Sequence, residues 1–465
     1  MSYFTWTGNP WVDAGVSAML AWSKKKEPIE ITKADIAKIS DDLEAIYLTD
    51  GWRSNLYSVF PNHPAIQSFG IKTKNLPQME RAANFKKLRK RQREEFCALL
   101  TRLGEGITQL EKEGECIACG RRSVQERPNR MHIPLTGYQG SHFFSHKADG
   151  VDYCHACTYA VQCSPLVLYR CGNKLVLVHS NSFKVLRYWA DKCLNAVRKQ
   201  VLKKDFVGCF DEGFKNPLNA LFHITQDLIN DYNELWAEEN ANIRIYYFTN
   251  YGQGADLAIY DLPARVFRFL AMVRKLPALS DWLQVVRKGY RYSIEEKEER
   301  DYKNYPNDVY QKLLTNESIV RYFLDYTNKR ALGGWSLLSL YLKEVKTMDQ
   351  KRIDLIRRVA DDLAELIKTS ANPKKELNRI ESADNYGWFR NVLLRFMKKH
   401  VAAGDEKPLF TFEEYVEQLF PDGALGWKET QDLILFRIYE ELHPWLLKEG
   451  IVAKPEEEEA EQSEN

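Results

Sequence analysis

Two cysteine pairs constrain the fold of this chain more than any other feature. Cys116-Ile117-Ala118-Cys119-Gly120 and Cys154-His155-Ala156-Cys157 form a CxxC…CxxC pattern, with residues 120–153 between the pairs. Four thiolates on two such turns can surround one tetrahedral Zn²⁺, and the glycine after Cys119 lets the backbone curl around the metal. The spacer is longer than the roughly 15–20 residues that are usual for this motif, which weakens the pattern without removing it. The sequence therefore predicts a zinc site made by Cys116, Cys119, Cys154 and Cys157.

The chemistry of the cysteines leaves two alternatives open, a redox-active dithiol and a cluster without metal. The nine cysteines are an odd number, and the chain starts without the basic and apolar segments of a signal peptide. We therefore expect a cytoplasmic, reducing location, no disulfide framework and no membrane partner. His142, His146 and His155 are candidate substitute ligands, although each also fits an ordinary loop histidine. Since four thiolates leave no coordination position open, the zinc would be structural rather than hydrolytic.

The net charge of +2 hides opposite charges in different regions of the chain. Residues 348–465 hold 17 Lys and Arg against 25 Asp and Glu, whereas residues 72–133 hold 15 against 8. The densest cationic run lies on a helix predicted from about Gln78 to Leu103, and it comprises Lys86, Lys87, Arg89, Lys90, Arg91 and Arg93. Such a run can bind phosphates through counterion release without reading sequence. The alternative is a solvated helix face that is balanced by Glu94 and Glu95.

The spacer between the cysteine pairs carries a second set of candidate nucleic-acid ligands, namely Arg121, Arg122, Arg127, Arg130, Tyr138 and Gln139. Arginine forks bind phosphate or guanine and glutamine pairs with adenine, so a metal-pinned loop with these residues can approach a nucleic acid. The alternative is a solubilising loop whose arginines bind nearby carbonyl groups. The turn at Asn9 is a further candidate for contact with nucleic acid.

Hydrophobic periodicity predicts the α+β class, with a mixed N-terminal region, a zinc-ribbon-like insert and a C-terminal helical bundle. Residues 166–169 with 175–178, and residues 243–249 with 257–260, are typical of strand pairs. No strand signal follows residue 264, and four apolar stripes predict bundle helices, one of them through Phe412, Val416 and Leu419. We expect an α+β domain at 1–262, a helical connecting region at 263–347, the bundle at 348–453 and a solvated acidic tail at 454–465.

Motifs for catalysis are missing from the sequence. It contains no GxxxxGK[ST] phosphate loop, no HExxH, no GxSxG and no GxGxxG after a predicted strand. We therefore predict a protein that is not an enzyme. The alternative from a different class is a zinc-containing nucleic-acid-processing enzyme with an unrecognised active site.

Several landmarks together resemble one known family. Residues 7–15 (TGNPWVDAG), the two CxxC pairs, residues 248–253 (FTNYGQ) and residues 259–263 (IYDLP) occur in this order in the first 263 residues. They look like the CXXC-CXXC family of CRISPR-associated proteins, the large subunit of the type I-B Cascade surveillance complex. The helical remainder is similar to that family only in character.

The resemblance implies a definite role for the chain. Such a subunit contacts the guide RNA and the target double-stranded DNA, recognises the protospacer-adjacent motif, stabilises the R-loop and supports recruitment of a helicase-nuclease. Its other partners would be the Cascade backbone, 5′-handle-binding and small subunits. The target sequence would be selected largely by base pairing between the guide RNA and the target DNA. In related complexes a small subunit arises from internal translation, and Met348 is a candidate start for such a fragment.

Overall fold

The computed structural model describes residues 3–109, 115–123, 125–127, 129–135, 152–231, 241–250, 255–277, 279–291, 299–402, 404 and 407–452. The chain forms two compact units. The N-terminal unit comprises Met1–Asp231, Ala241–Leu262 and Glu299–Asn304, and the C-terminal unit comprises Tyr232–Asn240, Pro263–Glu298 and Tyr305–Asn465. Helices and sheets occur together, so the predicted α+β class is confirmed.

A five-stranded sheet organises the N-terminal unit in the order β5-β3-β4-β6-β7. Its strands are β3 (Tyr169–Cys171), β4 (Lys174–Ser180), β5 (Phe210–Asp211), β6 (Ile243–Thr249) and β7 (Asp256–Leu262). All neighbours are antiparallel except β3 and β5. The predicted strand at residues 166–169 is largely wrong, because Ser164–Val167 form a 3-10 turn with a proline in its first positions, and β3 begins only at Tyr169.

The N-terminal unit contains several helices, of which the first is buried. They are α1 (Pro10–Ser23), α2 (Lys33–Tyr47), α3 (Asp50–Val59), α4 (Gln78–Gly106), α5 (His155–Cys163), α6 (Phe183–Lys203) and α7 (Pro217–Asp231). Residues 12–21 of α1 are buried without interruption, because α1 packs against α5, α6 and β4. At Gly15 a Cβ would lie 1.7 Å from the Ala160 carbonyl oxygen, so α1 and α5 touch backbone to backbone there.

The C-terminal unit is mainly helical. It contains α9 (Ala264–Lys275), α10 (Leu279–Lys288), α11 (Asp308–Thr315), α12 (Trp335–Glu344), α13 (Gln350–Lys368), α14 (Pro373–Glu381), α15 (Tyr386–Ala402), α16 (Phe412–Glu414) and α17 (Trp427–Lys448). The predicted stripe of α13 is confirmed, since Ile353, Ile356, Ala360, Leu363 and Ile367 are all buried. The stripes of α15 and α17 are buried as well.

Three details of this unit differ from the sequence prediction. Helix α14 was not expected, and β8 (Leu324–Asp325) pairs with β9 (Arg330–Ala331) where no strand signal was seen. The predicted stripe through Phe412, Val416 and Leu419 is wrong, because only Leu419 is buried. Helix α16 is followed at once by a π-helical turn, Tyr415–Leu419, and the changed period moves the apolar residues off one face.

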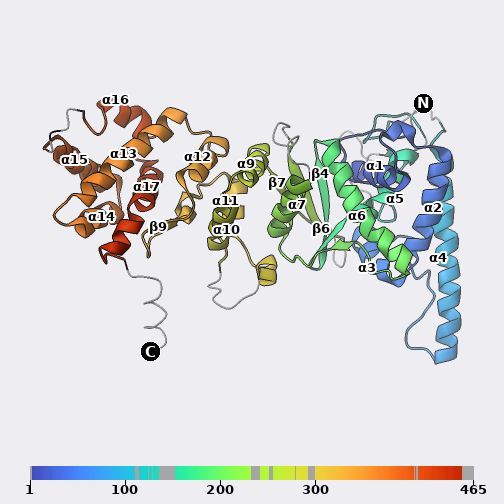
Figure 1. The fold of residues 1–465 in the computed structure, drawn as a ribbon. Coiled ribbons are helices and arrows are strands. Elements are labelled where there is room, and N and C mark those ends of the chain that lie inside the picture. Colours follow the sequence, from blue (N-terminus) through green and yellow to red (C-terminus); the bar gives the residue numbers. More distant parts are fainter. Residues whose placement is uncertain are drawn as a thin grey trace. The chain divides into compact units, whose positions relative to one another are not determined.

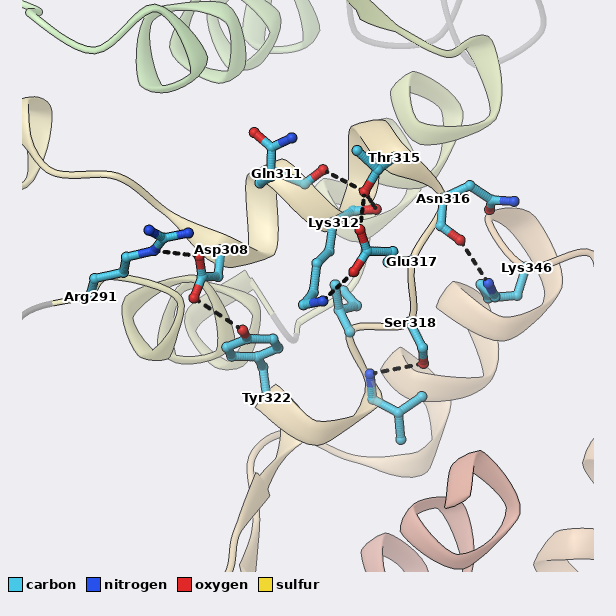
Figure 2. A network of polar contacts seen from close by, with 12 residues as sticks. Arg291, Asp308, Gln311, Lys312, Thr315, Asn316, Glu317, Ser318, Tyr322 and Lys346 are labelled. Atoms are coloured by element: carbon cyan, nitrogen blue, oxygen red, sulfur yellow. Dashed lines mark hydrogen bonds and ion pairs between the residues drawn. The ribbon is translucent and has the colours of Figure 1, made fainter. Parts of the chain in front are cut away.

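Polar contacts fix α11 and the segment that follows it (Figure 2). Asp308 at the start of α11 accepts hydrogen bonds from Arg291 and from the Tyr322 hydroxyl, at 2.8 and 3.5 Å. At the other end Asn316 adopts a left-handed conformation, and its carbonyl oxygen accepts a hydrogen bond from Lys346 at 3.0 Å. These contacts tie α11 to the turn Val320–Phe323 and to the end of α12.

Helix α17 joins the predicted bundle to the residues that precede it. Phe436 packs edge-on against Phe323, and its ring lies 6.1 Å from that of Trp335. Glu440 accepts a hydrogen bond from the Trp335 backbone nitrogen at 2.7 Å. The expected boundary at residue 348 stays a prediction, and these contacts connect the residues on its two sides. Among the described residues, no helix combines the length and apolarity that crossing a bilayer requires.

Candidate functional site

The first cysteine pair lies in a tight turn outside helices and strands. The Gly120 nitrogen donates to the Cys116 carbonyl oxygen at 2.8 Å, and the Cys116 nitrogen donates to the Arg121 carbonyl oxygen at 3.0 Å. Gly120 has a φ of +72°, a conformation that favours glycine. This turn directs Cys116 inward, where it is 3% exposed, and leaves Cys119 half-buried.

The second pair lies at the start of α5. Cys154 is the N-cap residue, and its sulfur accepts a hydrogen bond from the Cys157 nitrogen at 3.4 Å. The unpaired N–H groups and the dipole at a helix N-terminus stabilise negative charge, so this position favours thiolates. The short strand β2 (Tyr153–Cys154) pairs with β1 (Gln125–Glu126) and forms a two-stranded ribbon that enters the helix.

The four predicted ligands converge on one point. The sulfur atoms of Cys116, Cys119, Cys154 and Cys157 all lie within 4.8 Å of one another. The Cys119 and Cys154 sulfurs are 3.6 Å apart, and no disulfide forms. A zinc ion with Zn–S bonds of about 2.3 Å would require sulfur–sulfur edges of about 3.8 Å in a tetrahedron. The donor set and its spacing therefore fit a metal ion such as zinc, within a zinc-ribbon-like insert.

The protonation of the cluster also favours a cation. Hydrogen bonds from Cys119 and then from the other two thiols lower the pKa of Cys116 well below its ordinary value. Hydrogen bonds with Cys116 and then with the other two sulfurs raise the pKa of Cys157. Four thiolates this close repel one another, so all four can lose their protons only if a cation compensates the charge.

The insert is anchored to α1 at two places. The Arg121 guanidinium donates to the Tyr3 carbonyl oxygen at 2.5 Å, just before α1. The Asn9 side chain caps α1 by accepting hydrogen bonds from the nitrogens of Trp11 and Val12, and its amide donates to the Tyr153 hydroxyl at 3.2 Å. The proposed contact of Asn9 with nucleic acid stays a prediction, and the structure gives this side chain a role inside the protein.

A buried chain of polar groups links the insert to the core on its other side. Gln162 of α5 accepts a hydrogen bond from His63 at 3.1 Å and donates to the His132 carbonyl oxygen at 3.1 Å. His132 in turn donates to the Arg127 carbonyl oxygen at 3.2 Å. Burial lowers the pKa of His63 to about 3 and that of His132 to about 4, so both rings are neutral.

The spacer arginines mainly contact the protein itself. Besides Arg121, Arg122 pairs with Glu115 at 3.2 Å, Arg127 pairs with Asp152 at 3.4 Å and Arg130 donates to the Asn250 carbonyl oxygen at 3.3 Å. Arg122 and Arg127 are exposed, so they remain accessible from solvent. Tyr138 and Gln139, like His142 and His146, lie outside the described residues, whereas His155 is buried in α5 against Gly106. Binding of nucleic acid by these residues stays a prediction.

The predicted basic helix is α4, and it is three residues longer than expected. Figure 1 shows its N-terminal turns extending beyond the rest of the N-terminal unit. Four of its six cations have acidic partners: Arg89 pairs with Asp50, Lys90 with Glu94, Arg91 with Glu95 and Arg93 with Glu44. Lys86 and Lys87 are exposed and have no acidic partner among the described residues.

These ion pairs leave α4 available to phosphates. Lys90, Arg91 and Arg93 have side chains 79%, 54% and 68% exposed. Surface pairs of this kind contribute about 0–1 kcal/mol, so a phosphate can replace a carboxylate at small cost. Arg89 differs because its side chain is only 24% exposed. The structure therefore adds Asp50 and Glu44 to the neutralising acids that the sequence suggested, and it singles out Lys86 and Lys87.

Comparison with known protein families gives a match over the segment that carries the cysteine pairs. Residues 109–169 match the family described as CRISPR-associated protein (Cas_CXXC_CXXC). The matched segment contains both cysteine pairs, the ribbon and α5. No curated protein and no solved structure matches the chain.

Proposed function

We propose that this chain, whose residues 109–169 match the family described as CRISPR-associated protein (Cas_CXXC_CXXC), is the noncatalytic large subunit of a type I-B Cascade surveillance complex. In this role it contacts guide RNA and target double-stranded DNA, helps to recognise the protospacer-adjacent motif and stabilises the R-loop. It also supports recruitment of a helicase-nuclease, and it works in the cytoplasm with the backbone, 5′-handle-binding and small subunits.

One juxtaposition supports this proposal most strongly. The same unit carries a cysteine cluster that fits structural zinc and a projecting helix with exposed cations. Helix α5 packs against α4, so the metal-pinned helix directly supports the cationic one. A zinc ion with four thiolate ligands would fix this framework without supplying catalysis. Clustered lysines and arginines supply salt-dependent affinity for phosphate, which suits a subunit that leaves sequence choice to guide pairing.

Copurification tests this proposal. The tagged chain is coexpressed with a guide RNA and the other CRISPR-associated proteins of its host, and the purified assembly is analysed for RNA and for subunit composition. We expect a guide RNA and repeated backbone subunits to copurify with the chain. An assembly that contains neither RNA nor backbone subunits would contradict the proposal.

A second candidate function rests on a cluster of catalytic-type side chains in the N-terminal unit. His223 lies 3.2 Å from Glu212 and 3.5 Å from Asp227, and the three groups can hold a metal ion. This cluster would serve the alternative reading of a nucleic-acid-processing enzyme. However, the Lys192 ammonium pairs with both carboxylates, at 3.3 Å from Glu212. Burial lowers the pKa of Lys192, but the contacts with Asp227 and Glu212 outweigh it and raise the pKa overall.

The ion pairs of Lys192 support one of the two readings of this cluster. A divalent cation would have to displace an ammonium group that already pairs with both carboxylates, so the arrangement favours a structural ion-pair cluster. Cleavage of DNA or RNA by the purified chain with Mn²⁺, lost in Asp227→Asn, would support the enzyme. Intact substrate in both proteins would support the noncatalytic subunit.

In the proposed complex, a product that starts at Met348 would have to refold without the residues before it. It would lose Phe323 and Trp335 as packing partners of Phe436. It would also expose a face of α17 that packs against β9 and the turn Val320–Phe323. An immunoblot against the C-terminus tests the proposal: a short product that disappears in Met348→Leu would support it, and no short product would end it.

A further inference from the structure

Helices α14 and α15 carry positive charge in a region that is otherwise acidic. Residues 372–402 hold seven Lys and Arg against three Asp and Glu, whereas residues 403–452 hold four against eleven. The proposed functions of α4 and of the cysteine cluster do not involve this hairpin. Its charge therefore requires a separate explanation, and a local cationic surface points to an anionic partner.

A groove on the two helices consists of two neighbouring hollows that share Arg379 in their lining. Its larger part, of about 550 Å³, is lined by Arg379, Asn385, Gly387, Trp388, Asn391, Val392 and Arg395. A second hollow, of about 390 Å³, shares Arg379 and adds Lys374, Lys375 and Asn378. Trp388, Asn391 and Arg395 follow one another at intervals of three and four residues, which places them on one face of α15. The lining thus combines cations, amides and one large aromatic ring.

One buried acid holds two cations of the groove, Arg379 and Arg395, together with the nearby Lys399. Glu376 is 5% exposed, and it pairs with Arg379, with Lys399 at 3.0 Å and with Arg395 at 3.8 Å. Burial raises the pKa of Glu376, but the hydrogen bonds from Lys399 and Arg379 outweigh it and lower the pKa overall. One carboxylate cannot neutralise three cations, so the groove keeps an excess of positive charge on positioned side chains.

Trp388 gives the groove a feature that a phosphate site alone does not need. Its side chain is 49% exposed, and its ring has no aromatic or cationic partner among the described residues. An exposed indole beside arginines is a surface on which an unpaired base can stack, with the arginines near the flanking phosphates. In a duplex the bases are already stacked on one another, so a single strand fits this combination better.

We propose that the groove of α14 and α15 binds single-stranded nucleic acid, with a base on Trp388 and phosphates at Arg379 and Arg395. This inference rests on the proposed function, because it names the part of an opened target, an unpaired strand, that the C-terminal unit holds. The amide group of Asn391 lines the same groove and can meet a base edge. The Asn385 amide instead accepts a hydrogen bond from the Trp388 nitrogen at 2.8 Å and donates to Asp384 at 2.7 Å, so it holds the start of α15.

Binding of a fluorescein-labelled 20-nucleotide polythymidine strand to the full-length, zinc-loaded chain tests the groove. Fluorescence anisotropy should show that Trp388→Ala weakens binding about ten-fold, because a stacked base contributes on the order of 1–3 kcal/mol. Trp388→Phe keeps an aromatic face, so its affinity for the strand should fall less than that of Trp388→Ala. Leu394→Ala is the matched control, since Leu394 is an exposed apolar residue of the same helix outside the groove, and it should bind like the wild type.

The outcomes separate this inference from the proposed function. An unchanged affinity of Trp388→Ala for the strand would overturn the groove assignment. This holds even if the variant no longer bound another protein subunit, because the groove would then be a protein-binding surface. The same proteins are therefore tested against a duplex of equal length. If the wild type binds the duplex and Trp388→Ala binds the strand normally, only the groove assignment fails. If the wild type binds neither strand nor duplex, both fail.

Discussion

The two units of this chain stabilise their buried polar groups in different ways. In the N-terminal unit, residues far apart in the sequence meet: Asn9 reaches Tyr153, and Cys119 meets Cys154. In the C-terminal unit, amphipathic helices pack through their apolar stripes, and buried charges are ion-paired, as for Arg437 with Asp361 at 2.6 Å. A metal ion and neutral hydrogen bonds would thus hold the first unit, whereas apolar stripes and ion pairs hold the second. The two units should respond differently to metal removal, acid and charge deletion.

Loss of the metal should produce the largest difference between the units. Cys116→Ser removes one of four thiolates, and structural zinc contributes on the order of 10 kcal/mol to small folded sites. We expect the variant to lose zinc and the N-terminal unit to lose protection in hydrogen-exchange mass spectrometry, while α13 and α17 stay protected. Cys97→Ser is the control, because Cys97 lies on α4 outside the cluster. Full zinc content and unchanged protection in Cys116→Ser would refute the metal assignment.

Acid should destabilise the N-terminal unit next most strongly. His63 has a folded pKa of about 3, against about 6.5 in the unfolded chain. Its neutral form contributes stability that is present above pH 6.5 and is lost as pH falls toward 3, because the unfolded chain binds the proton first. The loss should approach about 1.4 kcal/mol per pH unit between these values.

Urea unfolding at several pH values measures this effect. His63→Leu should flatten the decline between pH 6.5 and 4 relative to the wild type. The cysteine cluster contributes equally to both proteins, so the difference reports on His63 alone. An identical decline in both proteins would show that His63 does not titrate as its burial suggests.

Charge deletion should affect the C-terminal unit by an intermediate amount. Arg437 is 9% exposed and pairs with Asp361, Glu440 and Glu441. Arg437→Ala should cost about 2 kcal/mol, less than a fully buried pair, because the three carboxylates remain partly hydrated. Hydrogen exchange should localise the loss to α13 and α17. Loss of hydrogen-exchange protection in the N-terminal unit of Arg437→Ala, rather than in α13 and α17, would contradict the proposed difference between the units.

Helix caps should show the smallest difference. Asn372 caps α14 through the Lys375 nitrogen, and Asn372→Ala should cost about 1 kcal/mol. Asn9→Ala should cost more than Asn372→Ala, because Asn9 also donates to Tyr153. Asn9→Ser keeps a capping oxygen and should recover most of the cap but not the Tyr153 contact. Equal losses for Asn9→Ala and Asn372→Ala in thermal unfolding would mean that the Tyr153 contact contributes nothing.

Local patterns in the sequence predicted the parts of the fold that local physics determines. The stripe of α13 and the strand at residues 243–249 follow from hydrophobic period, and α4 from its helix-forming composition. The π-helical turn after α16 could not be predicted, because a single inserted residue changes the period without a change in composition. Helix α14 is short, with few apolar residues, so its stripe was too weak to recognise.

The candidate site was predictable in composition but not in contacts. The spacing of the two CxxC pairs was enough to predict that the four cysteines lie together, because ligands of one metal ion meet in space however far apart they are in the sequence. Sequence could not reveal that Asp50 and Glu44 would pair with Arg89 and Arg93, since these acids lie on other helices. A proline at the start of α14 and the helix-cap pattern at Asn372 are signals that could have located the basic groove.

The salt dependence of duplex binding tests most directly whether α4 holds a nucleic acid. Lys86→Gln with Lys87→Gln removes two exposed lysines from α4, and Lys199→Gln with Lys203→Gln removes the same charge from the exposed surface of α6. If α4 contacts phosphates, the plot of the logarithm of the binding constant against the logarithm of the salt concentration should become less steep by about 2 in the α4 variant. Each phosphate contact contributes about 0.9 to that steepness. The α6 variant should keep the wild-type slope. Equal slopes for the wild type and the α4 variant would contradict a phosphate-binding role for α4.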